Sequence, residues 1–115
     1  MININTLLDD VKENIAHGSV HPGSLVIVSW KGSMFPLGKV LPINYMGTPG
    51  ITLYLSKPYG DPAMTVDELK TSMEALIQTN NPTVINITEP DGSATRPPDH
   101  SDVMGMDGIL LLRFV

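Results

Sequence analysis

Apolar side chains near the start of the chain recur every three or four residues, which is the spacing of one helix face. The pattern predicts a helix from about Thr6 to His17. Thr6 is a residue type that caps helices, and Gly18 can adopt the left-handed conformation that often ends them. The apolar face of this predicted helix consists of Leu7, Leu8, Val11 and Ile15.

A second helix is predicted by a stronger start signal. Thr65 is followed three residues later by Glu68, and this spacing is typical of a capping box, in which each side chain accepts a hydrogen bond from the other residue's backbone amide. Apolar residues then keep one stripe as far as Ile77, and the residues 80–82, Asn-Asn-Pro, end the helix. The sequence therefore predicts a helix that begins at Val66.

Five apolar segments predict strands. The residues 25–30 are β-branched and apolar on both faces, which is typical of a central strand covered on both sides. Pro42 cannot donate a ladder hydrogen bond, so its segment is predicted to be an edge strand or to bulge at that position. The other predicted strands are Lys39 to Tyr45, Ile51 to Leu55, Thr83 to Thr88 and Ile109 to Val115.

The predicted elements follow the order helix, three strands, helix, two strands. This order predicts one α+β domain over residues 1–115, in which a mostly antiparallel sheet of about five strands carries both helices, chiefly on one face. The other face of the strand 25–30 then needs cover, either from the segment 89–108 or from a second subunit. We therefore expect a homodimer more than a monomer.

The segment from Glu89 to Gly108 is predicted to be a long loop, and loops of this length usually have a function. It contains five acidic residues against Arg96 alone, a formal charge of −4 with histidine neutral. We predict that it is the partner-binding surface, with Asp99 and Asp102 as the main contacts and His100 modulating them with pH. The other predicted partner-binding residues are Arg96 and Asp107. The alternative is that the segment only connects two strands.

Two groups of residues bear on catalysis or metal binding. His17, His21 and His100 could converge on a metal ion, and the run Asp99 to Asp102 contains a histidine and a serine between two carboxylates. Neither group has a spacing specific to a metal site or a catalytic triad, and both residue sets are common in turns. We therefore predict no cofactor and no metal. A small enzyme or metal-binding protein built on His100 and the loop aspartates remains an alternative.

Composition narrows the classes of partner. The formal net charge is −5, and positive charge is not concentrated anywhere, which argues against binding to nucleic acid or to an acidic membrane. The chain has no cysteine, no recognisable signal peptide and no apolar stretch of about 18 residues, so we expect a soluble cytoplasmic protein. Methionines at positions 34, 46, 104 and 106 would suit an adaptable contact surface, although methionine also fills cores.

Two resemblances accompany these patterns. The stretch from Met64 to Leu69, with Leu76 and the residues 81–84, is similar to a helix-to-strand unit of small phage and bacterial proteins whose family implies no activity. The element order and acidic charge resemble type III secretion chaperones, which are small dimeric α+β proteins. The leading functional prediction is a non-enzymatic accessory or protein-interaction domain. A secretion-type chaperone or inhibitor with an acidic binding surface is the alternative.

Overall fold

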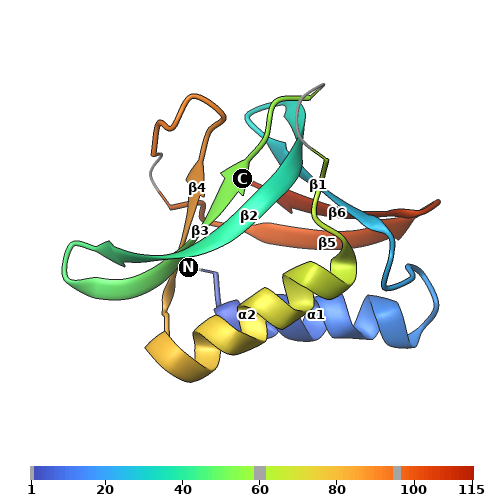
Figure 1. The fold of residues 1–115 in the computed structure, drawn as a ribbon, viewed down its shortest axis with the longest axis horizontal. Coiled ribbons are helices and arrows are strands. Elements are labelled where there is room, and N and C mark those ends of the chain that lie inside the picture. Colours follow the sequence, from blue (N-terminus) through green and yellow to red (C-terminus); the bar gives the residue numbers. More distant parts are fainter. Residues whose placement is uncertain (1, 59–61, 95–96) are drawn as a thin grey trace.

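Two helices and one six-stranded sheet make up the fold of the chain (Figure 1). The computed structural model describes residues 2–58, 62–94 and 97–115. The strands lie side by side in the order β4-β3-β2-β1-β6-β5. The elements in chain order are α1 (Ile4–Ala16), β1 (Leu25–Trp30), β2 (Ser33–Tyr45), β3 (Thr48–Leu55), α2 (Val66–Asn80), β4 (Val84–Thr88), β5 (Ser101–Met106) and β6 (Ile109–Phe114).

The α+β class and both helices are confirmed, but the sheet differs from the prediction. It has six strands rather than about five, and it is mixed. The pairs β1–β2, β2–β3 and β5–β6 are antiparallel, whereas β1–β6 and β3–β4 are parallel. The parallel pair β3–β4 arises because α2 connects these two neighbours and returns the chain to the same end of the sheet, as a crossover helix does.

The sixth strand, β5, comes from the segment predicted as a loop. Its residues alternate between polar or methionine positions and small or apolar ones, and it contains Gly105, so it lacks the β-branched signal of a strand. The two-residue turn Asp107–Gly108, in which Gly108 has a φ of +80°, folds β5 back onto the strongly apolar β6. The prediction of an irregular segment from Glu89 to Gly108 is therefore wrong over β5.

The two helix starts differ in how well the sequence predicts them. In α2 the capping box is present as predicted: the Thr65 hydroxyl accepts from the Glu68 backbone N–H at 3.2 Å, and the Glu68 carboxylate accepts from the Thr65 N–H at 3.1 Å. In α1 the cap is Asn3, whose Oδ1 accepts from the Thr6 N–H at 3.1 Å. Thr6 is therefore the residue that is capped rather than the cap.

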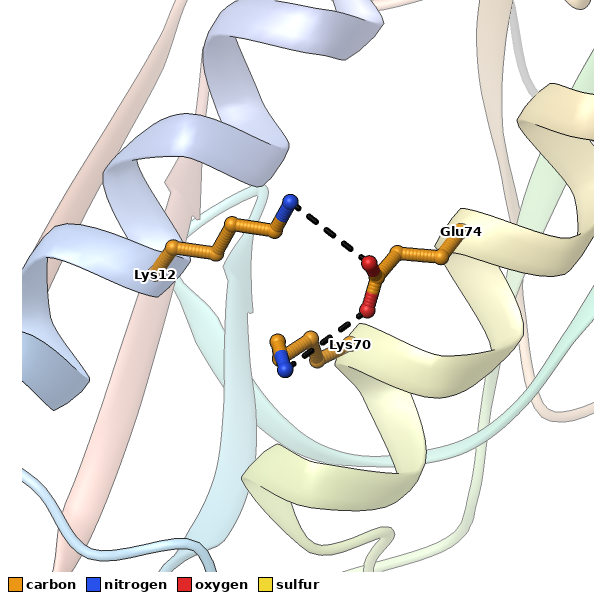
Figure 2. A network of polar contacts seen from close by, with 3 residues as sticks. All are labelled: Lys12, Lys70 and Glu74. Atoms are coloured by element: carbon orange, nitrogen blue, oxygen red, sulfur yellow. Dashed lines mark ion pairs between the residues drawn. The ribbon is translucent and has the colours of Figure 1, made fainter.

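Both helices cover the same face of the sheet and lie next to each other (Figure 1). Figure 2 shows Glu74 of α2 between two lysines, with Lys12 Nζ of α1 at 3.6 Å and Lys70 Nζ at 3.7 Å from its carboxylate oxygens. The three side chains are about 40% exposed, and ion pairs of this kind contribute roughly 0–1 kcal/mol. Apolar packing therefore holds the helices in place.

The hydrophobic core lies between the helices and the covered face of the sheet. On β1 and β6 every second residue points to it, so Val26, Val28, Leu110 and Leu112 are fully or almost fully buried. The helices contribute the stripe that the sequence predicts for α1 and the corresponding stripe of α2. The helix residues of the core are Ile4, Leu7, Leu8, Val11, Val66, Leu69 and Met73.

Pro42 lies in the part of β2 that has a paired neighbour on one side only. The pairing of β2 with β1 covers only the residues 33–36, so the second half of β2 has β3 as its one paired neighbour in the sheet. Pro42 pairs with Ile51 in that half, and the irregularity in the ladder lies earlier, between Leu37 and Lys39. Pro42 therefore lies at a local edge of the sheet, and of the two predictions for its segment, an edge strand and a bulge, the edge strand applies.

Candidate functional site

The second face of the sheet is open over four neighbouring strands. Directly paired residues in a sheet point to the same face, so the registers define which side chains share it. We call this surface the open face. Its members are Leu25, Ile27 and Ser29 of β1, Met34 and Pro36 of β2, Ile109, Leu111 and Arg113 of β6, and Asp102, Met104 and Met106 of β5.

The open face is apolar and exposed at several positions. Leu25 is 44% exposed, Met34 54%, Met104 37% and Met106 42%. Leu111 lies between these residues in the register and is itself almost buried. Large apolar side chains gathered on one surface are typical of an interaction site rather than of ordinary scattered exposure. Within the described chain this face of β1 is not fully covered, and cover from a second subunit, which the sequence analysis leaves open, stays a prediction.

Three of the four methionines that the sequence places near turns lie on this surface. Met34, Met104 and Met106 come from β2 and β5, which flank the face, while Met46 lies in the β2–β3 turn and is 90% exposed. Methionine has three rotatable bonds and a polarisable sulfur, so it adapts to irregular partner surfaces. The open face thus combines apolar area with side chains that can change shape.

The same side of the sheet is closed over β3 and β4. The register places Thr52, Asn86 and Thr88 there, and all three are at most 8% exposed. The hydroxyls of Thr52 and Thr88 are 2.6 Å apart, and the Thr52 hydroxyl also donates to the Asn86 carbonyl oxygen at 3.3 Å. Most of the accessible apolar surface on this side therefore lies over β1, β5, β6 and the start of β2, and Leu41 of β2, which pairs with Thr52, is the exception at 39% exposed.

One ion pair lies on the open face. Arg113 Nη2 donates to Asp102 Oδ2 at 3.1 Å across the β5–β6 pair, and both side chains are about half exposed. Asp102, one of the predicted partner-binding residues, is thus part of the open face and already has a partner. A second protein that contacts it must share or replace the bond from Arg113.

The other predicted partner-binding residues lie along β5. Asp99 and His100 are exposed and precede the strand, and their backbone N–H groups both donate to the Val115 carbonyl oxygen, at 2.8 and 3.2 Å. Asp107 is exposed in the turn after the strand. We call Asp99, His100, Asp102 and Asp107 the β5 rim. Arg96, the fifth predicted residue, lies outside the described residues.

The β5 rim is a line of charges rather than a cluster. A strand rises about 3.3 Å per residue, so the backbones of Asp102 and Asp107 are roughly 16 Å apart. Asp99, His100 and Asp102 lie towards one end of β5, and Asp107 lies at the other. The rim therefore borders the open face along its outer strand, where it can meet charges spread along a partner surface.

The geometry gives no support to the catalytic or metal-binding alternatives. In the described part of the chain, no three histidine, aspartate or glutamate side chains are close enough to hold a metal ion, so His17, His21 and His100 do not converge. In the run Asp99 to Asp102, only Ser101 and Asp102 belong to β5, and successive side chains of a strand point to opposite sides. No hydrogen bond joins the His100 ring to a described serine or aspartate.

The first part of the predicted loop forms a compact turn after β4. The Glu89 N–H donates to the Ser93 carbonyl oxygen at 2.9 Å, and Asp91 Oδ1 accepts from the Ser93 N–H at 2.9 Å. The hydrogen bond from the Ser93 backbone, followed by that from its hydroxyl, holds the pKa of the Asp91 carboxyl below its ordinary value. Asp91 therefore acts as a turn residue.

Comparison with known proteins adds nothing to this geometry. No protein-family model, curated protein or solved structure matches the chain. Neither α1 nor α2, the helices of the described residues, is long and apolar enough to span a membrane.

Proposed function

We propose that this chain is a non-enzymatic accessory domain that functions by binding another protein through the open face. The observation that carries the proposal is the apolar surface shared by Leu25, Met34, Met104 and Met106, each more than a third exposed. A partner that covers apolar surface of this kind removes it from water, and this burial stabilises the complex by roughly 25 cal/mol per Å².

The charge of the chain favours a basic partner. The formal net charge is −5, and the β5 rim places three aspartates beside the open face, where Arg113 is the one basic member. A partner with an apolar patch bordered by lysine or arginine would meet both features at once. Complementary charge of this kind mainly raises the association rate and the specificity.

A second copy of the chain is the other candidate occupant. The Asp102–Arg113 pair makes the open face self-complementary in charge, because each group could bond its counterpart across a two-fold axis. Against this, two chains of formal charge −5 repel each other at long range. A basic partner therefore accounts for both the apolar area and the acidic rim. A domain that binds such a partner could be a secretion-type chaperone or an inhibitor.

A pair of matched variants tests the proposal. Met104→Glu places a charge in the open face, whereas Met46→Glu makes the same change in the exposed β2–β3 turn. Both variants and the wild type serve as bait for quantitative capture from cells of the source, after circular dichroism shows equal folding. We expect the specific partners to fall at least tenfold with Met104→Glu and to stay with Met46→Glu.

The rim gives the second arm of this experiment. Asp99→Asn and Asp107→Asn remove charge without touching the ion pair at Asp102. We expect these changes to weaken partner capture mostly at low salt, because exposed charges are screened as ionic strength rises. Equal capture by the wild type and Met104→Glu would move the binding site away from the open face and overturn the proposal.

A further inference from the structure

A cavity of about 490 Å³ opens where β1 and β6 end, at the border of the open face, with which it shares Ser29 and Arg113. These two strands run parallel, so their carboxyl ends lie together, and the β1–β2 turn at Lys31 and Gly32 forms one side. Cavities of this size lined mostly by apolar groups are typical of sites for small molecules.

Two of the residues that line the cavity are aromatic. Trp30 and Phe114, the last residues of β1 and β6, both line it and are 7% and 3% exposed. Their rings belong to the hydrophobic core, so they are fixed by packing and do not depend on a ligand for their position. An apolar body entering the cavity therefore meets a preformed surface.

Trp30 also has an unused hydrogen-bond donor. Its Nε1 is buried and has no hydrogen-bond partner among the described residues. Buried polar groups are nearly always bonded, so the unpaired indole N–H of a residue that lines the cavity is a candidate donor to a ligand bound there.

Two cations line the same cavity, Lys31 from the β1–β2 turn and Arg113 from β6. Lys31 Nζ lies 5.7 Å from the centre of the Trp30 ring, and Arg113 carries five donors, of which one bonds Asp102. Lys31 is also 3.7 Å from Glu89. The lysine and arginine side chains are 60% and 55% exposed, and exposed ion pairs of this kind contribute little, so an incoming anion can compete for both cations.

We propose that this cavity binds a small carboxylate with an apolar body, such as an aryl-alkanoic acid. The apolar body lies against Trp30 and Phe114, and the carboxylate accepts hydrogen bonds from Lys31 and Arg113. The indole N–H of Trp30 is a further donor to the same ligand. Arginine suits this role because its planar fork matches the two carboxylate oxygens.

Trp30 is the one tryptophan of the chain and lines this cavity, so the tryptophan fluorescence comes from a residue of the proposed site. The full chain is titrated to millimolar concentration with 3-phenylpropionate, with 3-phenylpropylamine as the matched cation and 3-phenylpropanol as the matched neutral compound. We expect a saturable change in fluorescence with the carboxylate, and binding by the amine and the alcohol that is at least tenfold weaker.

Three variants test whether the carboxylate binds in this cavity. Lys31→Asn removes one cation at a position with a φ of +51°, which asparagine tolerates well, so this variant retains its turn. Arg113→Gln removes the other cation, and Lys39→Gln is the control, because Lys39 lies over Tyr54 and outside the cavity. We expect the dissociation constant for 3-phenylpropionate to rise about tenfold in Lys31→Asn and in Arg113→Gln, and to stay unchanged in Lys39→Gln.

Three results would overturn the proposal. The first is no saturable response to 3-phenylpropionate, and the second is equal binding of the carboxylate, the amine and the alcohol. The third is a response that Lys31→Asn leaves intact. The cavity shares Ser29 and Arg113 with the open face, whereas Lys31 lies outside it, so the result with Lys31→Asn separates this proposal from the protein-binding function.

Discussion

At the scale of single residues, the clearest signals in the sequence are those whose partners lie within one turn of the chain. Thr65 and Glu68 bond each other's backbone as their spacing predicts, and Asn81 ends α2 in the left-handed conformation with a φ of +45°. The α1 cap shows the limit of such signals. Asn3 and Thr6 are both good caps, and the burial of Ile4 in the core extends the helix back to Asn3.

Removal of the α2 cap is the residue-scale prediction. Thr65→Ala deletes the hydroxyl that accepts from the Glu68 N–H, so we expect the free energy of unfolding to fall by about 1 kcal/mol. Chemical denaturation measures this loss. Thr71→Ala, at an exposed position inside α2, is the control and should leave stability unchanged or slightly higher. Equal midpoints for Thr65→Ala and the wild type would show that the cap contributes nothing.

At the scale of elements, the main lesson is β5. Its apolar members are two methionines and Val103, and nothing within Ser101 to Met106 predicts a strand by itself. It forms because β6 offers a long apolar neighbour and because the turn at Gly108 closes the hairpin. The strand carries Asp102 of the rim and two of the methionines, so the open face could not be predicted without it.

The contact of β5 with the end of α1 gives the element-scale prediction. A Cβ placed on Gly105 would lie 2.6 Å from the Ser19 Cβ and 3.1 Å from the Ser19 carbonyl oxygen. Gly105→Ala should therefore displace β5 from the segment after α1 and destabilise the fold by about 1–3 kcal/mol, as overpacking does. The control is Gly23→Ala, where the added methyl group meets open space.

Hydrogen exchange would show whether the damage is local. In Gly105→Ala we expect the amides of β5 to lose protection before those of β1 and β3. Unchanged stability and unchanged exchange in this variant would mean that the α1 end moves freely away from β5.

At the scale of the whole molecule, the two faces of the sheet differ: one is packed against the helices and the other is open. One face carries both helices and the core, and the other is apolar over β1, β5, β6 and the start of β2. Four strands about 4.8 Å apart and five residues long cover on the order of 300 Å² of sheet. That is less than half of the roughly 800 Å² per partner in a standard interface.

Self-association is the prediction at this scale. Because the open face is small and the chain carries a formal charge of −5, we now expect a monomer at about 10 µM and weak dimers only near millimolar concentration. Sedimentation equilibrium measures this, and Met104→Glu should remove what association there is. A stable dimer at 10 µM that Met104→Glu dissociates would instead assign the open face to a second copy.

For the candidate sites too, the sequence shows which residue types are present but not which distant residues come together. The sequence offers three of the open-face methionines and all the β5 rim residues as candidates, because composition and charge are visible without a structure. It does not show that Met34 and Met104 share a surface, or that Trp30, Lys31 and Arg113 line one cavity. Those residues are far apart in the chain, and only the β1–β6 register brings their strands together.

By itself, the sequence determined the two helices, their amphipathic faces, the α2 cap and five of the strands, since each depends on residues a few positions apart. The tertiary structure alone decided the parallel pairing of β1 with β6, the formation of β5 and which face of the sheet stays open. These features depend on pairing between distant segments, and the free energy of that pairing comes from burying apolar surface in one shared core, which no local pattern records.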